Sequence, residues 1–136
     1  MTVIKFNIQV MIVDGKELVY HIDNQIFHCP LSVTMNFIGG KWKAIILWYI
    51  HMNDGPMRFG EIKGFIPDIT EKMLSLQLQS LIEDDILLRT DHGGRPRRVD
   101  YQLTTFGETF IPILQEIRNW GAIQGEVIGS LEERGV

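Results

Sequence analysis

The chain has 136 residues, of which 45% are hydrophobic and 22% are charged, and its formal net charge is -4 at pH 7. This length fits one domain with a real core, and no apolar run is long enough to span a bilayer. The acidic balance excludes a protein that coats nucleic acid indiscriminately, although a specific binder needs only a local positive field. Because the first residues lack the features of a signal peptide, we expect a cytoplasmic protein without a membrane partner.

Residues 2–26 have the character of strands. Apolar and polar residues alternate from Ile4 through Ile8 and Val10 to Ile12, which is the period of a half-buried strand. Asp14-Gly15 is a hairpin signal, and pairing Ile12 with Leu18 would require a three-residue loop, Asp14-Gly15-Lys16. We therefore predict an N-terminal β-hairpin extension over residues 1–26. A lone hairpin is marginal in water, so it must pack on the rest of the domain or on a second subunit.

Two helices are predicted next. Pro30 suits the first turn of a helix over about Leu31–Ile38, and Gly39-Gly40 ends it. A second helix covers Lys41–Met52. Its apolar stripe consists of Trp42, Ile45, Ile46, Tyr49 and Ile50.

A short helix over Arg58–Phe65 and a longer one over Glu71–Asp84, joined by a tight turn at Pro67, fit a helix-turn-helix. Thr70 is a suitable N-cap for the longer helix. Its leucines at helical spacing, Leu74, Leu78 and Leu81, are expected to face the core. The side chains that then point away are Lys72, Ser75, Leu76 and Gln79, with Gln77 on the flank.

A basic hairpin follows this helix pair. Strands are predicted over Ile86–Thr90 and Arg97–Leu103, with a loop at His92-Gly93-Gly94 between them. Thr104 should cap a last helix over about Thr105–Gly121, whose pattern can continue to Leu131 and which Pro112 should kink or restart. The order of elements predicts a fold that is mainly α with a small β-wing (α+β), a winged helix-turn-helix, over residues 27–136.

The cationic hairpin needs an anionic partner, and double-stranded DNA fits it. A helix can enter the major groove, where glutamine and serine can bond to bases and an apolar side chain can touch a thymine methyl. Arginines suit phosphates and the minor groove. An ordinary solvated helix face and surface turn are the alternative interpretation. The predicted DNA-binding residues are Lys72, Ser75, Leu76, Gln77, Gln79, Arg95, Arg97, Arg98, Lys41 and Arg58.

Several motifs, in order along residues 27–121, carry a resemblance to one family. They are Cys29-Pro30, Gly39-Gly40-Lys41-Trp42, Gly55-Pro56-Met57-Arg58-Phe59, Ile69-Thr70-Glu71-Lys72-Met73-Leu74 and Arg95-Pro96-Arg97-Arg98-Val99-Asp100-Tyr101. This combination resembles the HxlR-type transcriptional regulators. The resemblance implies that the Thr70 helix is the recognition helix and that residues 91–98 form the wing. It also implies a homodimer that binds a pseudo-palindromic operator through two recognition helices.

Dimerisation through the first and last helices is a further implication of the resemblance. The dimerisation residues would be Phe110, Ile113, Leu114, Ile117 and Trp120. The chain departs from the family pattern where arginines are common at Gln77 and Gln79 and where a glycine is usual at Asp85. Its first 26 residues also exceed the usual N-terminal segment.

Cys29 matches a cysteine that some relatives use to sense oxidants or electrophiles. A helix N-terminus beside His28 would favour the thiolate, and a disulfide would have to be intermolecular because no second cysteine exists. A packed structural cysteine is the alternative.

No cofactor, metal site or catalytic constellation is indicated, so we do not expect an enzyme. A winged-helix protein-interaction module and a small-molecule-responsive regulator remain the alternatives. The inducer, the operator and the direction of regulation are left open.

Overall fold

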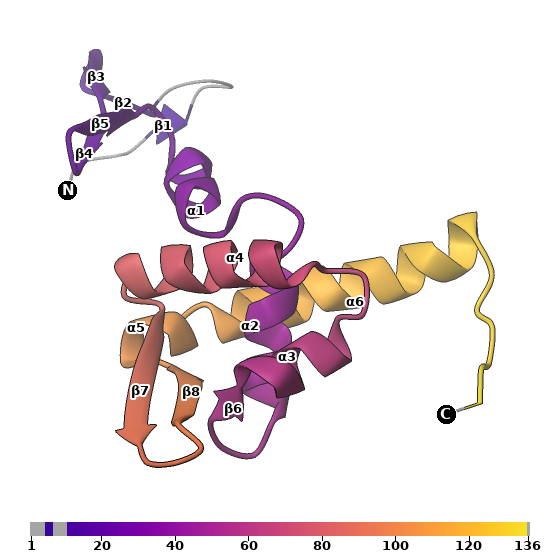
Figure 1. The fold of residues 1–136 in the computed structure, drawn as a ribbon. Helices are drawn as coiled ribbons and strands as arrows, with labels where there is room; N and C mark the ends of the chain where they lie inside the picture. The colour runs from indigo at the N-terminus through magenta and orange to yellow at the C-terminus, as the bar shows by residue number, and fades with distance from the viewer. Residues whose placement is uncertain (1–4, 7–10, 136) are drawn as a thin grey trace. The chain divides into compact units, whose positions relative to one another are not determined.

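The structure is a computed structural model that describes residues 5–6 and 11–135. The burial and contacts of side chains are described from Asp14 onward. The chain divides into two compact units, Met1–Gly40 and Lys41–Val136 (Figure 1). The expected division into an extension of residues 1–26 and a DNA-binding domain of residues 27–136 stays a prediction.

Short antiparallel strands and one helix make up the described part of the first unit. Three strands form a sheet in the order β1-β2-β3, and two further strands, β4 and β5, form a separate pair. The bounds are β1 (Lys5–Phe6), β2 (Met11–Val13), β3 (Lys16–Leu18), β4 (Tyr20–Ile22), β5 (Gln25–Phe27) and α1 (Pro30–Ile38). Pro30 lies in the first turn of α1 and Gly39 caps its end, as predicted.

The predicted register of the first hairpin is wrong. Met11, not Ile12, lies opposite Leu18, so the loop consists of two residues, Asp14-Gly15. Both loop residues have positive φ, 51° and 73°, which is the turn whose twist matches that of the flanking strands. A second turn of this kind, Asp23-Asn24, joins β4 and β5. The alternation predicted at Ile4, Ile8 and Val10 lies outside the described residues.

The second unit contains the predicted order of helices and a three-stranded sheet in the order β6-β8-β7 (Figure 1). A strand at Met57–Arg58 was not predicted, because two residues carry no periodicity. The bounds are α2 (Lys43–Met52), β6 (Met57–Arg58), α3 (Phe59–Phe65), α4 (Glu71–Glu83), β7 (Leu87–Gly93), β8 (Arg98–Leu103), α5 (Thr105–Glu108) and α6 (Ile111–Ile128).

Most predicted boundaries in this unit agree with the structure to within one or two residues, and two differ by more. The first strand of the hairpin runs on through His92 and Gly93, which were predicted as loop, and the turn falls at residues 94–97. The single last helix is two helices, α5 and α6, and Pro112 lies in the first turn of the second. The restart predicted at Pro112 is therefore confirmed, because proline fits a first helical turn but not a helix interior.

Aliphatic side chains from all layers of the second unit fill one core. Leu47 takes a core position on α2 that the predicted stripe omitted, while Ile45 of that stripe is exposed. Burying each such side chain stabilises the fold by about 1.5–3 kcal/mol. The fully buried side chains are Ile46, Leu47, Met57, Ile62, Ile69, Leu74, Leu78, Leu81 and Leu87.

Candidate nucleic-acid interface

Helix α4 is capped and anchored as its sequence predicted. Thr70 is in an extended conformation, and its Oγ1 accepts a hydrogen bond of 3.0 Å from the Met73 backbone N–H. The leucines Leu74, Leu78 and Leu81 are buried. This anchoring fixes the rotation of the helix and so determines which side chains face outward.

The outward face of α4 is exposed where the helical spacing predicted it. Lys72, Ser75, Leu76 and Gln79 are exposed, and Leu76 keeps 55% of its surface in solvent. Gln77 is half-buried, with its Nε2 3.3 Å from Met73 Sδ, so it lies on the flank. Gln79 Nε2 donates to Glu83 Oε1 at 3.1 Å, an exposed contact that an incoming base edge could replace.

Asp85 turns the chain from α4 into β7. Its φ of 58° lies in the left-handed region, where glycine fits best, and the Ile86 N–H donates to the Leu81 carbonyl at 2.9 Å. Thr104 Oγ1 donates to the Asp85 carbonyl at 2.6 Å and accepts from the Gly107 N–H at 2.9 Å. One hydroxyl therefore joins the end of α4 to the start of α5.

At the tip of the β7–β8 hairpin, Asp91 holds Arg97. The Asp91 carboxylate accepts from Arg97 Nε at 2.8 Å, from an Nη of the same side chain, and from the Gly93 N–H at 2.9 Å. The hydrogen bond from Arg97 is the largest cause that lowers the pKa of Asp91 to about 2, and Asp91 in turn raises the pKa of Arg97. Arg95 makes no hydrogen bond or ion pair with any residue that the structure describes.

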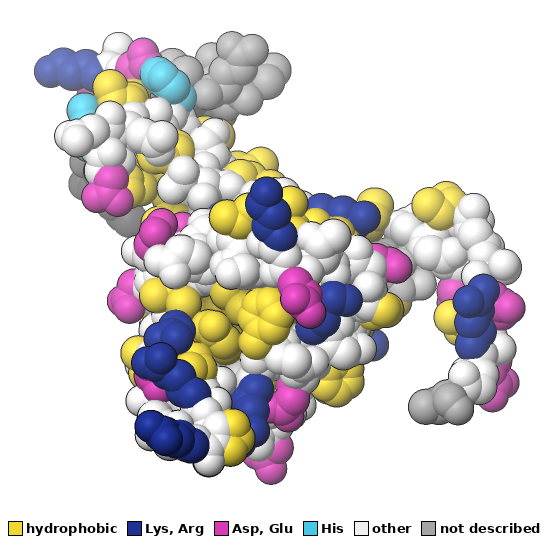
Figure 2. All heavy atoms as spheres, viewed as in Figure 1, with side chains coloured by type: hydrophobic (Ala, Val, Ile, Leu, Met, Phe, Trp, Pro, Cys, Tyr) yellow, Lys and Arg dark blue, Asp and Glu magenta, His cyan; other side chains and the backbone are white. Residues whose placement is uncertain are grey.

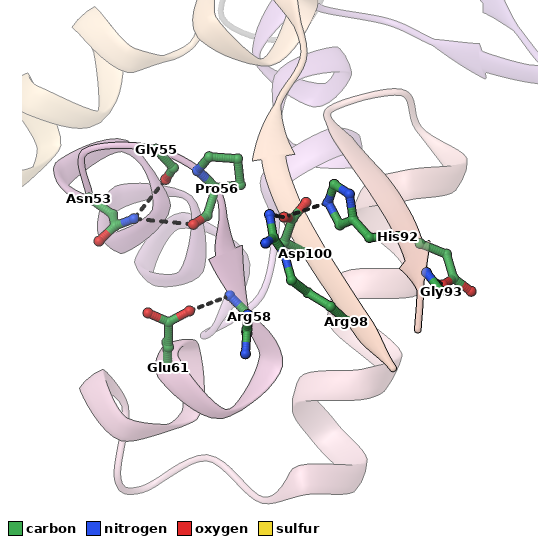
Figure 3. Close-up of polar contacts among 10 residues, drawn as sticks. Asn53, Gly55, Pro56, Arg58, Glu61, His92, Gly93, Arg98 and Asp100 are labelled. Carbon is green, nitrogen blue, oxygen red and sulfur yellow. Dashed lines mark hydrogen bonds and ion pairs between the residues drawn. The ribbon is translucent and has the colours of Figure 1, made fainter. Parts of the chain in front are cut away.

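Within β8, opposite Thr90 of β7, Asp100 is buried with only 5% of its surface exposed. His92 Nε2 lies 2.9 Å from Asp100 Oδ2, and an Arg98 Nη lies 3.7 Å from the same oxygen (Figure 3). Sequence reasoning singled out neither Asp100 nor His92. The available signal was an acid between the apolar Val99 and Tyr101 in the middle of a strand.

Other predicted basic residues lie at the starts of helices. Lys41 Nζ stacks 4.5 Å from the centre of the Trp42 ring. Arg58 is exposed where β6 meets α3, and its backbone N–H donates to Glu61 Oε1 at 2.9 Å. Arginine side chains gather over the β7–β8 hairpin (Figure 2).

The apolar face of α6 divides into a buried part and an exposed part. Leu114 is buried and Phe110 is half-buried, whereas Ile113 and Ile117 are about half exposed and Trp120 is 69% exposed. The exposed apolar side chains continue to Ile123, Val127 and Ile128. Exposed apolar side chains that follow one another along a single helix are typical of an interaction surface.

Cys29 precedes α1 and is partly exposed. The Ser32 hydroxyl, 3.2 Å from Cys29 Sγ, is the main cause that lowers the pKa of the thiol. Backbone N–H groups of Ser32 and Leu31, in the first turn of α1, lower the pKa as well, as expected at a helix N-terminus, whereas His28 has its Nδ1 2.9 Å from Glu17 Oε1.

No described helix combines the length and hydropathy needed to cross a membrane. Among the described residues, no group of side chains is arranged to hold a metal ion.

A capped helix with an exposed polar face, preceded by a short helix and followed by a basic hairpin, defines a DNA-binding transcription regulator of the winged helix-turn-helix class. A family model described as HxlR-like helix-turn-helix matches residues 37–128, and the chain belongs to this family, which consists of regulators and not of enzymes.

Named relatives agree with this assignment. The uncharacterised HTH-type transcriptional regulator YybR of Bacillus subtilis is 41% identical over 108 residues, which cover 79% of this chain and 85% of YybR. The redox regulator HypR in its reduced form is similar with a TM-score of 0.67 at 41% identity, covering 74% of this chain and 97% of HypR. Its oxidised form gives a TM-score of 0.65 at 40% identity, covering 79% and 100%.

Proposed function

We propose that this regulator binds a pseudo-palindromic operator as a homodimer, with α4 in the major groove and the β7–β8 hairpin on the adjacent backbone or minor groove. The carrying observation is that buried leucines fix α4 so that a polar face lies exposed beside a basic hairpin. The residues proposed to contact bases are Lys72, Ser75, Leu76, Gln77 and Gln79. Those proposed to contact phosphates or the minor groove are Arg95, Arg97, Arg98, Lys41 and Arg58.

Arg97 keeps a place in this proposal although Asp91 holds it. A guanidinium has five N–H donors, and the Asp91 carboxylate occupies only part of them. Its side chain is 71% exposed, so the remaining donors are open to a phosphate.

A homodimer is supported by the exposed apolar face of α6. One recognition helix has a small footprint, whereas two helices related by a two-fold axis read two half-sites about one DNA turn apart. The residues proposed for the dimer contact are Phe110, Ile113, Leu114, Ile117 and Trp120.

The test is selection of a duplex by the wild-type protein from random sequence, followed by affinity measurements over a range of salt concentrations. We expect Arg98→Ala to weaken binding to all duplexes and to reduce the salt slope by about one, the share of one phosphate contact. We expect Gln79→Ala to change base preference at one position by about 1–3 kcal/mol. A weak affinity for every duplex, with no salt slope, would instead favour a protein-interaction module.

We further propose that Cys29 makes this binding sensitive to oxidants. Its support is the lowered pKa of a partly exposed thiol and the likeness to HypR, which is described as a redox regulator with oxidised and reduced forms. Diamide should weaken operator binding by the wild type and leave Cys29→Ser unaffected, with Ser32→Ala showing an intermediate response because it loses the hydrogen bond that favours the thiolate. Equal responses of the wild type and Cys29→Ser would rule this role out.

A regulator that responds to a small molecule is the second candidate. An apolar pocket of about 240 Å³ lies between α2 and α6, and the Arg118 guanidinium lies 5.8 Å from the Trp48 ring at this pocket. An aromatic carboxylate would match that lining. Calorimetry with 2-naphthoate tests this candidate. An affinity that stays the same in Arg118→Gln would contradict it, because the Arg118 guanidinium is the group expected to bind the carboxylate.

A further inference from the structure

Asp100 occupies an unusual position in the sheet. It lies in β8 opposite Arg58 of β6 and Thr90 of β7. In the part of the chain whose side chains are described, it is the only charged residue that is buried. A buried carboxylate is costly unless hydrogen bonds and opposite charges compensate for the water that it loses.

Two side chains from two strands compensate Asp100 at a single oxygen atom. A carboxylate can only accept, so His92 must carry its proton on Nε2 and donate it to Asp100 Oδ2 at 2.9 Å. The Arg98 guanidinium approaches the same Oδ2 to 3.7 Å. Figure 3 shows His92 and Arg98 converging on Asp100 from β7 and β8.

A β-bulge places His92 for this contact. Asp91 pairs with Val99 and Gly93 pairs with Arg98, so His92 is an extra residue without a partner in the register. Bulges redirect a side chain relative to the regular alternation of a strand. The bulge therefore directs the His92 ring towards the Asp100 carboxylate.

The same face of the sheet carries a second arginine. Arg98 and Asp100 are two residues apart on one strand, and Arg58 is the cross-strand neighbour of Asp100, so the three share a face. Together with Pro56 and Glu61 they line a polar recess of about 400 Å³. The Arg98 side chain remains 52% exposed despite its contact with Asp100.

We propose that Asp100 is a positioning residue for DNA binding: its buried carboxylate holds Arg98 and His92 so that Arg98, beside Arg58, presents its guanidinium to a phosphate of the DNA backbone at this recess. The inference rests on the proposed DNA-binding function and adds to it a residue that itself touches no DNA. Holding Arg98 before DNA arrives reduces the conformational entropy that is lost on docking.

Removing the charge of Asp100 provides a test, because simple electrostatics and positioning predict opposite changes in the affinity for DNA. Simple electrostatics predicts that removing an acid from a DNA-binding face tightens binding. Positioning predicts that Asp100→Asn, which keeps the shape and removes the charge, weakens binding by up to about fivefold, the upper end for one partly exposed ion pair. Asp68→Asn, the same change at an exposed acid between α3 and α4, is the matched control and should bind as tightly as the wild type or more tightly.

A double-mutant cycle separates positioning from a general structural role. If Asp100 acts through Arg98, Asp100→Asn should weaken binding in the wild type but have little further effect in an Arg98→Ala background. The duplex is the one selected by the wild-type protein, and urea unfolding establishes that each variant is folded at the assay temperature. Folded Asp100→Asn that binds as tightly as the wild type, or losses that simply add, would overturn the inference.

A measurement on the wild-type protein tests the inference even if no variant folds. Relaxation of the guanidinium Nε in the free protein should show Arg98 ordered and Arg95 mobile, because of these two arginines Arg98 alone contacts a carboxylate. Equal mobility would contradict the positioning role even if Asp100→Asn is unfolded. Failure of the wild type to bind any duplex would overturn the proposed function itself, and this inference with it.

Discussion

Two acidic side chains organise the basic hairpin at the scale of single residues. Asp91 binds Arg97, and Asp100, one register pair further from the turn, binds His92 and Arg98, while Arg95 has no such partner among the described residues. The arginines of the sequence motif are therefore not equivalent. Two are held in place before any partner binds, and one can move to meet it.

The Asp91–Arg97 pair gives a prediction about pH. Because the hydrogen bond from Arg97 lowers the pKa of Asp91 to about 2 in the folded protein, the pair stabilises the fold above the ordinary carboxyl pKa and loses this contribution as pH falls from about 4 towards 2. Carbon NMR of the Asp91 carboxyl should show a midpoint near that value. The midpoint should rise towards 4 in Arg97→Ala, and a wild-type midpoint near 4 would contradict the pairing.

Asp85 matters at the scale of elements, because its left-handed backbone ends α4 and leads the chain into β7. The family resemblance implies a glycine here, and the φ of 58° gives the physical reason. A left-handed backbone costs an L-residue with a side chain roughly 1 kcal/mol, and glycine avoids this cost.

We therefore expect Asp85→Gly to raise the free energy of unfolding by about 0.5–1 kcal/mol, less any extra entropy of the unfolded chain. Urea unfolding followed by circular dichroism measures the change. Asp85→Ala, which removes the carboxylate but keeps a Cβ, is the control and should be less stable than the wild type. A glycine variant no more stable than the alanine variant would show that backbone strain is not what matters at this turn.

At the scale of the whole molecule, the exposed face of α6 determines the expected assembly. Ile117 and Trp120 lie on that face beyond the buried Leu114. A charge placed at the centre of an apolar interface remains unpaired and desolvated, which opposes association.

Ile117→Asp should therefore convert a dimer into a folded monomer, as measured by light scattering coupled to gel filtration. Leu88→Asp is the matched control, since Leu88 is 48% exposed on β7 and lies outside the proposed interface. A wild-type monomer at micromolar concentration would refute the dimer directly. An Ile117→Asp variant that remains dimeric would place the contact elsewhere on the chain.

The periodicity of the sequence by itself determined most of the second unit. The spacing of Leu74, Leu78 and Leu81 fixed which face of α4 is buried, and Thr70 fixed where the helix begins. These features are local, because a helix repeats its geometry every few residues along the chain. The same local reasoning failed for the first hairpin, where two registers place apolar residues plausibly and the turn conformation selects between them.

Only the tertiary structure determined which charged side chains of the hairpin contact one another. The strand β6, the bulge at His92 and the convergence of His92 and Arg98 on Asp100 each depend on pairing between residues distant in sequence. No motif encodes such a pairing, because it arises when separate strands are brought into register by the core beneath them. In the sequence, Asp100 was only one residue of the motif that resembles the family. In the folded chain it is a buried acid that holds two neighbouring side chains.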